Sequence, residues 1–470
     1  MNKMSEKNKT ELLKEELFSN TKSAPAKMSE QELSQVFDFC EGYKAFLNSC
    51  RTEREAAAFT VAKAIEKGYT EFDASCKYSA GDKVYFNNRG KSVILCTFGK
   101  KSIENGVKIV ASHIDSPRLD LKPNPLYEDC ELAYFKTHYY GGIKKYQWTV
   151  IPLALHGVIV KKNGESVNVS IGDAPSDPRF VITDLLPHLD RNMSKRTLDT
   201  AIPGETLNIL IGSLPFKGDE TSELVKLNIL NILHEKYGIV EDDFRTAELE
   251  AVPAIEAYDI GFDRSLIGSY GHDDRVCAYP SVIAAFDAEN PEYTTVTVIT
   301  DKEETGSDGN TGLNSAYLEH FIYDIASCFG ANGRDVIRKS ECLSADVNAG
   351  FDPNFPDVHD RLNAAYLNKG IVVTKYTGHG GKGGTSDASA EFVGKVSRVF
   401  NDAGVIWQTG ELGKVDEGGG GTVAKYVANL GMDVVDVGVP MLSMHAPFEL
   451  AAKIDVYMAY KGFKAFLEQK

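Results

Sequence analysis

The residues of this chain that could do chemistry are histidines, aspartates and glutamates at or near the ends of predicted strands. They occur in five segments, which read SHID at 112–115, GHDDR at 271–275, DKEETG at 301–306, SADV at 344–347 and MHAP at 444–447. Each segment alone carries little information, because an Asp-Asp pair that opens a helix can simply cap it. Imidazole nitrogens and carboxylate oxygens are, however, ligands for zinc and similar cations. Together the segments indicate two metal ions with a bridging water.

The spacing within these segments indicates different roles for neighbouring side chains. His113 and Asp115 are two residues apart, so on an extended chain they share a face, where the carboxylate can orient a metal-binding imidazole. Glu303 and Glu304 are adjacent, so their side chains diverge, and one can bind a metal while the other stays free as a general base. In the pair at 273–274, one aspartate could bridge two cations, with each oxygen facing one metal.

Alternating strands and helices must position these side chains. Apolar periodicity predicts helices over 29–68, 276–286, 315–329, 386–400 and 422–430, and strands over 93–98, 107–111, 294–300, 370–375, 405–408 and 434–439. Such alternation predicts an α/β sheet with helices on both faces. Ligands bind such sheets beyond the carboxyl ends of the strands, which is where the five segments fall.

Between residues 118 and 252 the pattern changes to a strand-rich one. Apolar runs at 158–160 and 167–171 flank Asn163-Gly164, a pair that favours a type I′ turn, and a helix is predicted over 222–236. We therefore predict a discontinuous catalytic domain, residues 1–117 and 253–470, interrupted by a β-rich domain of residues 118–252.

The composition excludes several classes of protein. The chain has 470 residues with 51 Lys and Arg against 67 Asp and Glu, a net charge of −16, which argues against nucleic acid or an anionic membrane surface as partner. No run of about 18 apolar residues occurs, so no membrane span is expected. The eight cysteines are dispersed without a C-x-x-C pair, which suits reduced thiols in the cytoplasm.

Six segments carry a family resemblance. In chain order they read ASHIDSPRLDLKPNP, GHDDRVCAYPS, DKEETGSDG, SADVNAGFDP, DEGGGGTVA and VPMLSMHAPFE. With these segments, nearly the whole chain after its N-terminal tail resembles the aspartyl aminopeptidase family of di-zinc metallopeptidases, in its bacterial form. The resemblance implies an α/β metallopeptidase domain with a central mixed β-sheet flanked by helices. It also implies that a β-rich dimerisation or assembly domain interrupts this one, and that the chain forms homo-oligomers, typically tetrahedral dodecamers.

The resemblance also implies a set of metal ligands. His113 and Asp346 would hold one zinc ion, Glu304 and His445 would hold the other, and Asp273 would bridge the two. Cobalt or manganese would suit these nitrogen and oxygen ligands as well. Three carboxylates against two divalent cations leave a net positive centre, which can polarise a peptide carbonyl.

The same resemblance implies the catalytic roles. Glu303 would be the general base, and Asp115 would orient His113. The expected reaction is hydrolysis of the N-terminal residue from peptides by a water molecule that the two metals activate.

Substrate recognition is less determined by the sequence. An acidic N-terminal residue would need a nearby cation, for which Lys375 and Lys382 are candidates, and without one the preference would be for neutral residues. The glycine loop that contains Gly419 and Gly420 could offer backbone N–H groups. His188 resembles a family residue that reaches the active site of a neighbouring subunit.

Several other functions remain open at this stage. Related di-metal centres also serve carboxypeptidases and deacylase-type amide hydrolases, and metals can serve only to brace an assembly. Residues 378–383 satisfy G-x-G-x-x-G between a predicted strand and helix, which is the pattern of an NAD(P)-dependent oxidoreductase. The acidic residue nearest the required spacing, Asp402, precedes a strand instead of ending one, which disfavours a dinucleotide site.

Overall fold

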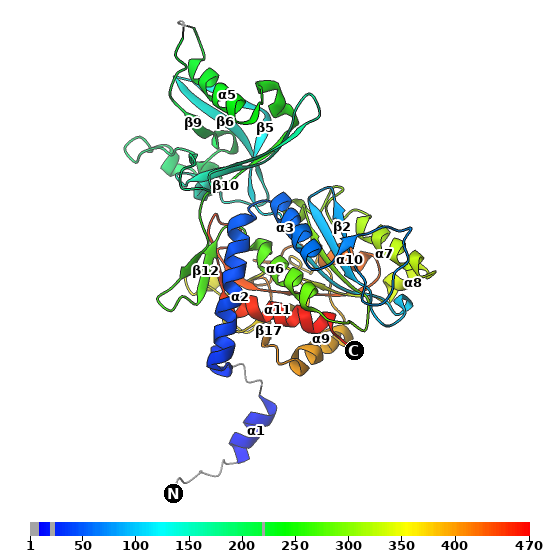
Figure 1. The fold of residues 1–470 in the computed structure, drawn as a ribbon. Coiled ribbons are helices and arrows are strands. Elements are labelled where there is room, and N and C mark those ends of the chain that lie inside the picture. Colours follow the sequence, from blue (N-terminus) through cyan, green and yellow to red (C-terminus); the bar gives the residue numbers. More distant parts are fainter. Residues whose placement is uncertain (1–8, 19–23, 219–220) are drawn as a thin grey trace.

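The structure is a computed structural model that describes residues 9–18, 24–218 and 221–470. Its largest element is a nine-stranded sheet with helices on both faces (Figure 1). Its strands, in spatial order, are β1 (Thr70–Glu71), β2 (Lys83–Asn88), β3 (Ser92–Thr97), β13 (Thr295–Thr300), β4 (Lys108–His113), β14 (Glu341–Ser344), β18 (Asp433–Gly438), β16 (Ile371–Thr374) and β17 (Trp407–Thr409).

The nine-stranded sheet is mixed. Its central strands β13, β4, β14 and β18 run parallel to one another, whereas β3 is antiparallel to β13 and β16 is antiparallel to β18. Every residue of β4 and β13 is buried, as expected for parallel strands covered on both faces. The predicted α/β fold with a central mixed sheet is confirmed.

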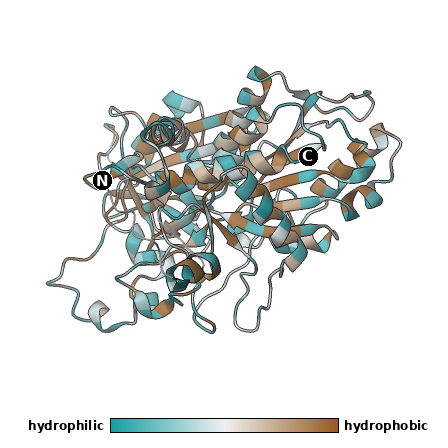
Figure 2. Cartoon of the chain, turned by 90° about the horizontal axis from the view of Figure 1, so that it is seen from below, coloured by the Kyte–Doolittle hydropathy of each residue, from teal (hydrophilic) through white to brown (hydrophobic). Residues whose placement is uncertain are grey.

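Two hydrophobic cores lie on the two faces of this sheet. Val110 of β4 belongs to one core, and its neighbours Ile109 and Ala111 belong to the other, because successive side chains of a strand point to opposite faces. Figure 2 shows hydrophobic stretches along the strands. The first core includes α2 (Glu30–Ser49), α3 (Glu53–Glu66), α6 (His272–Asp287), α9 (Ala390–Asp402) and α11 (Lys453–Leu467). The second core includes α7 (Tyr317–Cys328), α8 (Gly333–Arg338) and α10 (Ala424–Asn429). Helix α1 (Lys9–Leu17) is the first element of the chain.

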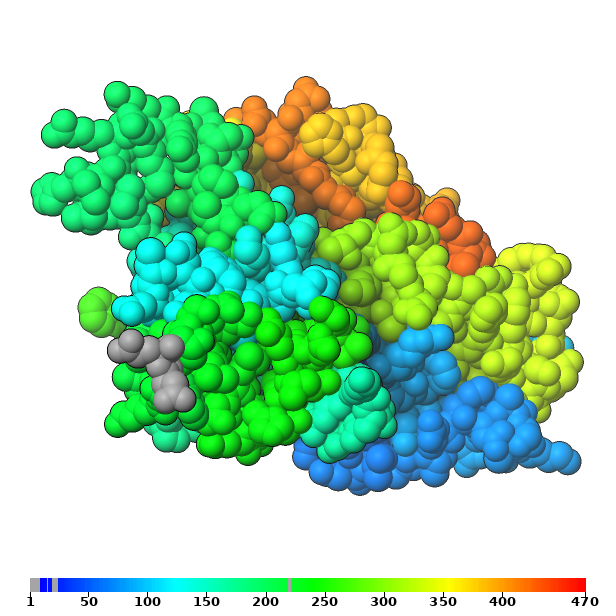
Figure 3. Space-filling model, turned by 90° about the horizontal axis from the view of Figure 1, so that it is seen from above, coloured from blue at the N-terminus to red at the C-terminus, as the bar shows by residue number. Residues whose placement is uncertain are grey.

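A second, antiparallel sheet takes its strands from the segment between β4 and α6. Its spatial order is β8 (Ser166–Ile171), β7 (Leu153–Val160), β10 (Ala247–Pro253), β5 (Arg118–Asp129), β6 (Leu132–Tyr140) and β9 (Ile209–Gly212). Helices α4 (Leu198–Ala201) and α5 (Leu224–Tyr237) belong to the same segment, and a third hydrophobic core surrounds the fully buried Trp148. We call residues 118–252 the inserted segment; in Figure 3 its cyan and green residues form one side of the molecule. The exact domain boundaries and an assembly role stay predictions.

A third sheet consists of five short strands that come from separate parts of the chain. Its order is β11 (Tyr258–Ile260), β12 (Leu266–Ser269), β20 (Glu449–Ala452), β19 (Pro440–Leu442) and β15 (Asn348–Ala349). Helix α6 begins soon after β12, and the loop between β19 and β20 carries His445. This sheet therefore supplies two of the segments that the sequence singled out.

Some local predictions were wrong. The helix predicted over 29–68 is two helices, because Thr52 starts α3 with a capping box. Asn163-Gly164 does not form a type I′ turn: only Gly164 has a positive φ, of +86°, whereas that turn needs two positive φ values. Helix α11 and strands β5 and β6 were not predicted. No helix among the described residues is long and apolar enough to cross a membrane.

Candidate metal centre

Three neighbouring parallel strands bring most of the predicted ligands together. His113 is the last residue of β4 and pairs in register with Thr300, the last residue of β13. A 3-10 turn at Glu303–Thr305 follows β13, and Asp346 follows β14 on the other side of β4. Since these strands are parallel, their carboxyl ends meet at one edge of the sheet, as the sequence analysis expected.

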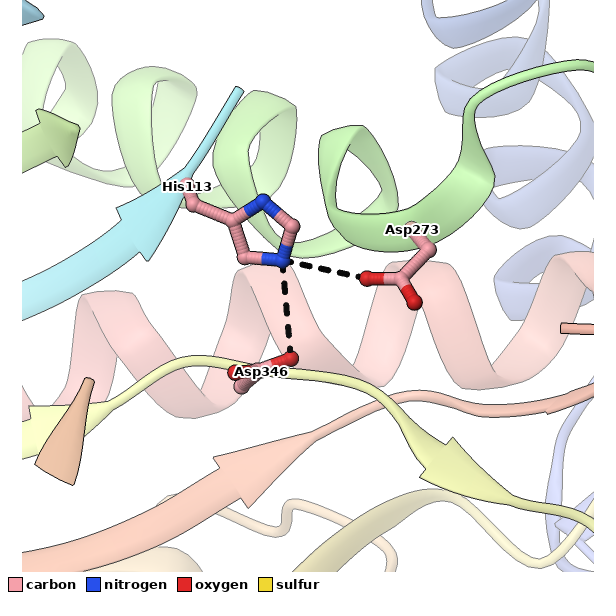
Figure 4. Close-up of side chains that lie close together, drawn as sticks. All are labelled: His113, Asp273 and Asp346. Atoms are coloured by element: carbon pink, nitrogen blue, oxygen red, sulfur yellow. Dashed lines mark hydrogen bonds and ion pairs between the residues drawn. The ribbon is translucent and has the colours of Figure 1, made fainter. Parts of the chain in front are cut away.

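The first group of ligand atoms surrounds the imidazole of His113. Its Nε2 atom lies 3.1 Å from Asp273 Oδ1 and 3.8 Å from Asp346 Oδ1. Figure 4 shows both carboxylates pointing toward this nitrogen from different elements. Glu303 Oε2 also lies 3.8 Å from His113 Nε2.

The second group of ligand atoms surrounds the imidazole of His445. Its Nε2 atom lies 3.2 Å from Asp273 Oδ2 and 3.6 Å from Glu304 Oε2. Asp273 therefore turns one carboxylate oxygen toward His113 and the other toward His445. That is the arrangement expected of a carboxylate between two cations.

The residues present fit divalent cations with nitrogen and oxygen ligands. His113, Asp273 and Asp346 offer ligand atoms within 4.8 Å of one another, and so do Asp273, Glu304 and His445. Glu304 Oε1 is buried without a hydrogen-bond partner among the described residues. A buried carboxylate oxygen is costly unless a cation or donor compensates it, and a bound metal would supply that compensation.

The pKa values at this site reflect crowded negative charge. Burial, together with the carboxylates of Asp273 and Asp115, raises the pKa of Glu303 to about 7 despite the opposing effect of His113. Burial would lower the pKa of His445, but its hydrogen bond to Asp273 and the nearby Glu304 carboxylate raise that pKa to about 10. The site thus favours positive charge, which divalent cations would provide.

Asp115 is placed to orient His113. The Nδ1 atom of His113 lies 3.3 Å from Asp115 Oδ1 and 3.1 Å from the Asp115 carbonyl oxygen. The backbone N–H groups of Glu303 and Glu304 each donate to the Asp115 carboxylate at 3.2 Å, and the Tyr140 hydroxyl donates to it at 2.7 Å. A donor Nδ1–H leaves Nε2 free to bind a metal, which is the usual arrangement around a ligating histidine.

Glu449 supports the other side of the site, and the sequence analysis missed it. Its two oxygens accept hydrogen bonds from the backbone N–H of His445, at 2.7 Å, and of Asp273, at 3.2 Å. The carbonyl oxygen of Gly142 lies 2.9 Å from His445 Nδ1. The position of Glu449, four residues after His445 in a segment already singled out, was the available signal; Tyr140 and Gly142 gave none.

A cavity of about 460 Å³ opens onto these side chains. Besides the carboxylates and His445, it is lined by Gly142, Val347, Asn348, Leu412, Met444 and the glycine loop that contains Gly419 and Gly420. The two glycines therefore lie where the sequence analysis expected substrate to bind. Their role in substrate binding stays a prediction.

The other residues predicted to bind substrate do not line this cavity. Lys382 makes an ion pair with Asp387 at 2.9 Å, and its Nζ atom lies 3.7 Å from the centre of the Tyr376 ring. Lys375 is exposed after β16, and His188 is exposed in a loop of the inserted segment. Within a single chain, the structure does not bring these three side chains to the metal centre.

The glycine pattern at 378–383 does not form a dinucleotide site. In such a site the glycine turn leads directly into a helix whose N-terminus faces the pyrophosphate. Here α9 begins at Ala390, and His379 instead forms a bridge with Gly383. The oxidoreductase alternative is therefore not supported.

Comparisons with known proteins show the family of this chain. The family model described as aminopeptidase I zinc metalloprotease, M18, matches residues 46–467. A probable M18 family aminopeptidase 1 of Clostridium acetobutylicum is 49% identical over 460 residues, covering 96% of this chain and 99% of that protein.

Solved structures of similar proteins share the fold. The crystal structure of an M18 family aminopeptidase from Thermotoga maritima has a TM-score of 0.92 and 42% identity, covering 96% of this chain and all of that one. A structure of the yeast mApe1 dodecamer, at 20% identity and a TM-score of 0.74, covers 91% of this chain and 96% of that one, and shows the fold alone. The chain thus belongs to the M18 family of zinc metalloproteases and is an aminopeptidase, a peptide hydrolase.

Proposed function

We propose that this aminopeptidase uses two divalent ions, both zinc. His113 and Asp346 would hold one ion, Glu304 and His445 would hold the other, and Asp273 would bridge them. The observation that carries this proposal is the position of Asp273, whose two oxygens lie 3.1 Å and 3.2 Å from the Nε2 atoms of different histidines. Two ions account for both contacts, whereas a single ion would leave one histidine without a role.

The protein side chains would then perform the proton transfers. When bound, the ions lower the pKa of water and polarise the scissile carbonyl. Glu303, which lines the cavity, accepts a proton from the attacking water and delivers it to the leaving amine nitrogen. Asp115 keeps the Nδ1 proton of His113 in place during these steps.

We propose a neutral N-terminal residue as the preferred substrate. Val347, Leu412 and Met444 give the cavity apolar walls, and none of the described residues that line it is a lysine or arginine. Lys382 forms an ion pair with Asp387 on the protein surface. An acidic side chain would lose its hydration in this cavity without gaining a cation from the same chain.

We also propose a homo-oligomer, with a tetrahedral dodecamer as its form. The inserted segment exposes several large apolar side chains, namely Leu185, Leu186, Leu189, Leu198 and Leu214, which supports an interface there. His188 lies within this exposed group and would reach the active site of a neighbouring subunit. The eight cysteines, none of them in a disulfide, support the predicted cytoplasmic location.

A panel of chromogenic aminoacyl substrates tests the proposal. Metal-replete protein should release Leu faster than Asp, Glu or Lys, and a chelator should abolish release. Two ions per chain should be found by elemental analysis. Faster release of Asp or Glu would contradict the neutral preference, and full activity at one ion per chain would contradict the two-ion centre.

A further inference from the structure

The end of β6 reaches the metal centre from the inserted segment. Tyr140, the last residue of β6, donates a hydrogen bond from its hydroxyl to Asp115 Oδ2 at 2.7 Å. Two residues later, the carbonyl oxygen of Gly142 accepts a hydrogen bond from His445 Nδ1 at 2.9 Å. One short stretch of chain, residues 140–142, therefore contacts both Asp115, which faces His113, and the imidazole of His445.

The contact with Asp115 matters because that carboxylate is fully buried. Its Oδ1 atom faces His113 Nδ1, and its Oδ2 atom receives the Tyr140 hydroxyl and the Glu304 backbone N–H. Loss of the hydroxyl would leave one oxygen of this buried carboxylate less restrained. The carboxylate could then rotate, and His113 would lose its fixed orientation.

Tyr140 is itself held firmly by the inserted sheet. Its side chain is 8% exposed, and the Arg118 guanidinium lies 3.9 Å from the centre of its ring. Arg118 pairs with Tyr140 across β5 and β6, and it forms ion pairs with Glu250 of β10, at 3.2 Å, and with Glu53 of α3, at 3.5 Å. The hydroxyl therefore cannot drift away from Asp115 without moving the sheet.

We propose that residues 140–142 position both metal-binding histidines, Tyr140 acting on His113 through Asp115 and Gly142 acting directly on His445. This rests on the two-ion centre proposed above. Tyr140 is a positioning residue, since its hydroxyl contacts Asp115 and not the ligand atoms. The inserted segment thus sets the metal affinity of the site as well as carrying exposed apolar surface.

The test measures metal affinity in two variants. Tyr140→Phe removes only the hydroxyl and keeps the ring beside Arg118. Gly142→Ala adds a Cβ atom 3.3 Å from His445 Nδ1 at a position whose φ is not positive, so it displaces the imidazole without straining the backbone. Full-length apoprotein is titrated with Co²⁺ against a competing chelator, and the visible absorption of the bound ions is followed. Each variant should weaken one binding step about 10- to 100-fold and change the absorption of that ion.

Tyr139→Phe is the matched control. Tyr139 is the neighbouring residue on β6 and is 43% exposed. The Tyr139→Phe variant should therefore bind Co²⁺ with the affinity of the wild type. Wild-type affinity and absorption in a folded Tyr140→Phe variant would overturn the proposal. If that variant fails to fold, Gly142→Ala decides, and unchanged affinity there would overturn it. Failure of the wild type itself to bind two ions would instead overturn the proposed centre.

Discussion

At the residue scale, two adjacent glutamates occupy different environments. Both donate their backbone N–H to the Asp115 carboxylate, so the turn that carries them is fixed against β4. From there Glu304 Oε2 lies 3.6 Å from His445 Nε2, whereas Glu303 Oε2 lies 3.8 Å from His113 Nε2, and both side chains border the cavity. The divergence of neighbouring side chains thus separates a proposed ligand from a proposed proton acceptor.

Glu303→Gln should separate catalysis from metal binding. The amide has the shape of the carboxylate but cannot accept the proton, so kcat should fall about 100- to 10,000-fold while the metal content stays at the wild-type value. Glu304→Gln is the contrasting variant and should lose metal. Steady-state kinetics and elemental analysis measure the two effects, and a kcat within threefold of wild type for Glu303→Gln would remove it as the general base.

At the element scale, the start of α3 is tied to the inserted sheet. Thr52 caps α3 with Glu55 in a capping box, and Glu55 Oε1 also lies 2.8 Å from His156 Nδ1 on β7. Asp173 Oδ1 lies 3.5 Å from His156 Nε2 and 2.7 Å from Arg51 Nε. The buried imidazole thus connects α3 with two parts of the inserted segment.

This connection should depend on pH. Burial would lower the pKa of His156, but the neighbouring carboxylates of Asp173 and Glu55 raise that pKa to about 9. The folded protein then holds a proton that the unfolded chain releases near pH 6.5, so the stabilisation is complete below that pH and is lost as the pH rises through 9. His156→Gln should lower the free energy of unfolding by at most about 3 kcal/mol at pH 6. Urea unfolding of both proteins from pH 6 to pH 10 measures the two free energies of unfolding. If the difference between them does not shrink as the pH rises, the proposed role of protonated His156 is contradicted.

At the scale of the whole molecule, the metal centre concentrates negative charge inside an acidic chain. Asp273, Glu304 and Asp346 are brought together from three different parts of a sequence with a net charge of −16. Without cations these buried carboxylates repel one another. Bound metal should therefore contribute to stability as well as to catalysis.

Removal of metal should lower the thermal midpoint of the protein. An ion present at about 100 times its Kd stabilises the folded state by about 2.7 kcal/mol, and that contribution disappears on chelation. Calorimetry should show a lower thermal midpoint in the presence of chelator, and added Zn²⁺ should restore the original midpoint. His445→Ala is the control, because it should respond less to the chelator. An equal response in both proteins would argue against His445 as a ligand.

Exposed leucines of the inserted segment should control assembly. Leu186 and Leu189 are 49% and 68% exposed and flank His188. The double substitution Leu186→Asp and Leu189→Asp places charge in the proposed interface, so the mass found by light scattering should fall while metal content stays constant. Ile65→Asp on α3, at a residue 56% exposed, is the control and should not change the mass. A wild-type mass for the double variant would locate the interface elsewhere.

Much of the site was predictable because local patterns mark the ends of strands. The apolar runs that become β4 and β13 stop just before His113 and Glu303, and parallel strands bring such ends to one edge. Strand β14, which ends two residues before Asp346, was not predicted. Helix α11 was missed although its core face is apolar, and so were β5 and β6, whose charged and polar residues obscure the alternation of a strand.

The sequence by itself therefore predicted the chemistry: the types and order of the proposed ligands, and the α/β sheet at whose strand ends three of them lie. Only the tertiary structure decided which carboxylate oxygen faces which histidine, that Glu449 and Tyr140 make hydrogen bonds around the proposed ligands, and that Lys382 lies against Asp387 and Tyr376 instead of in the cavity. The physical reason is that ligand identity follows from side-chain chemistry and local spacing. Contacts between residues far apart in the chain depend on how the sheets pack, which no local pattern encodes.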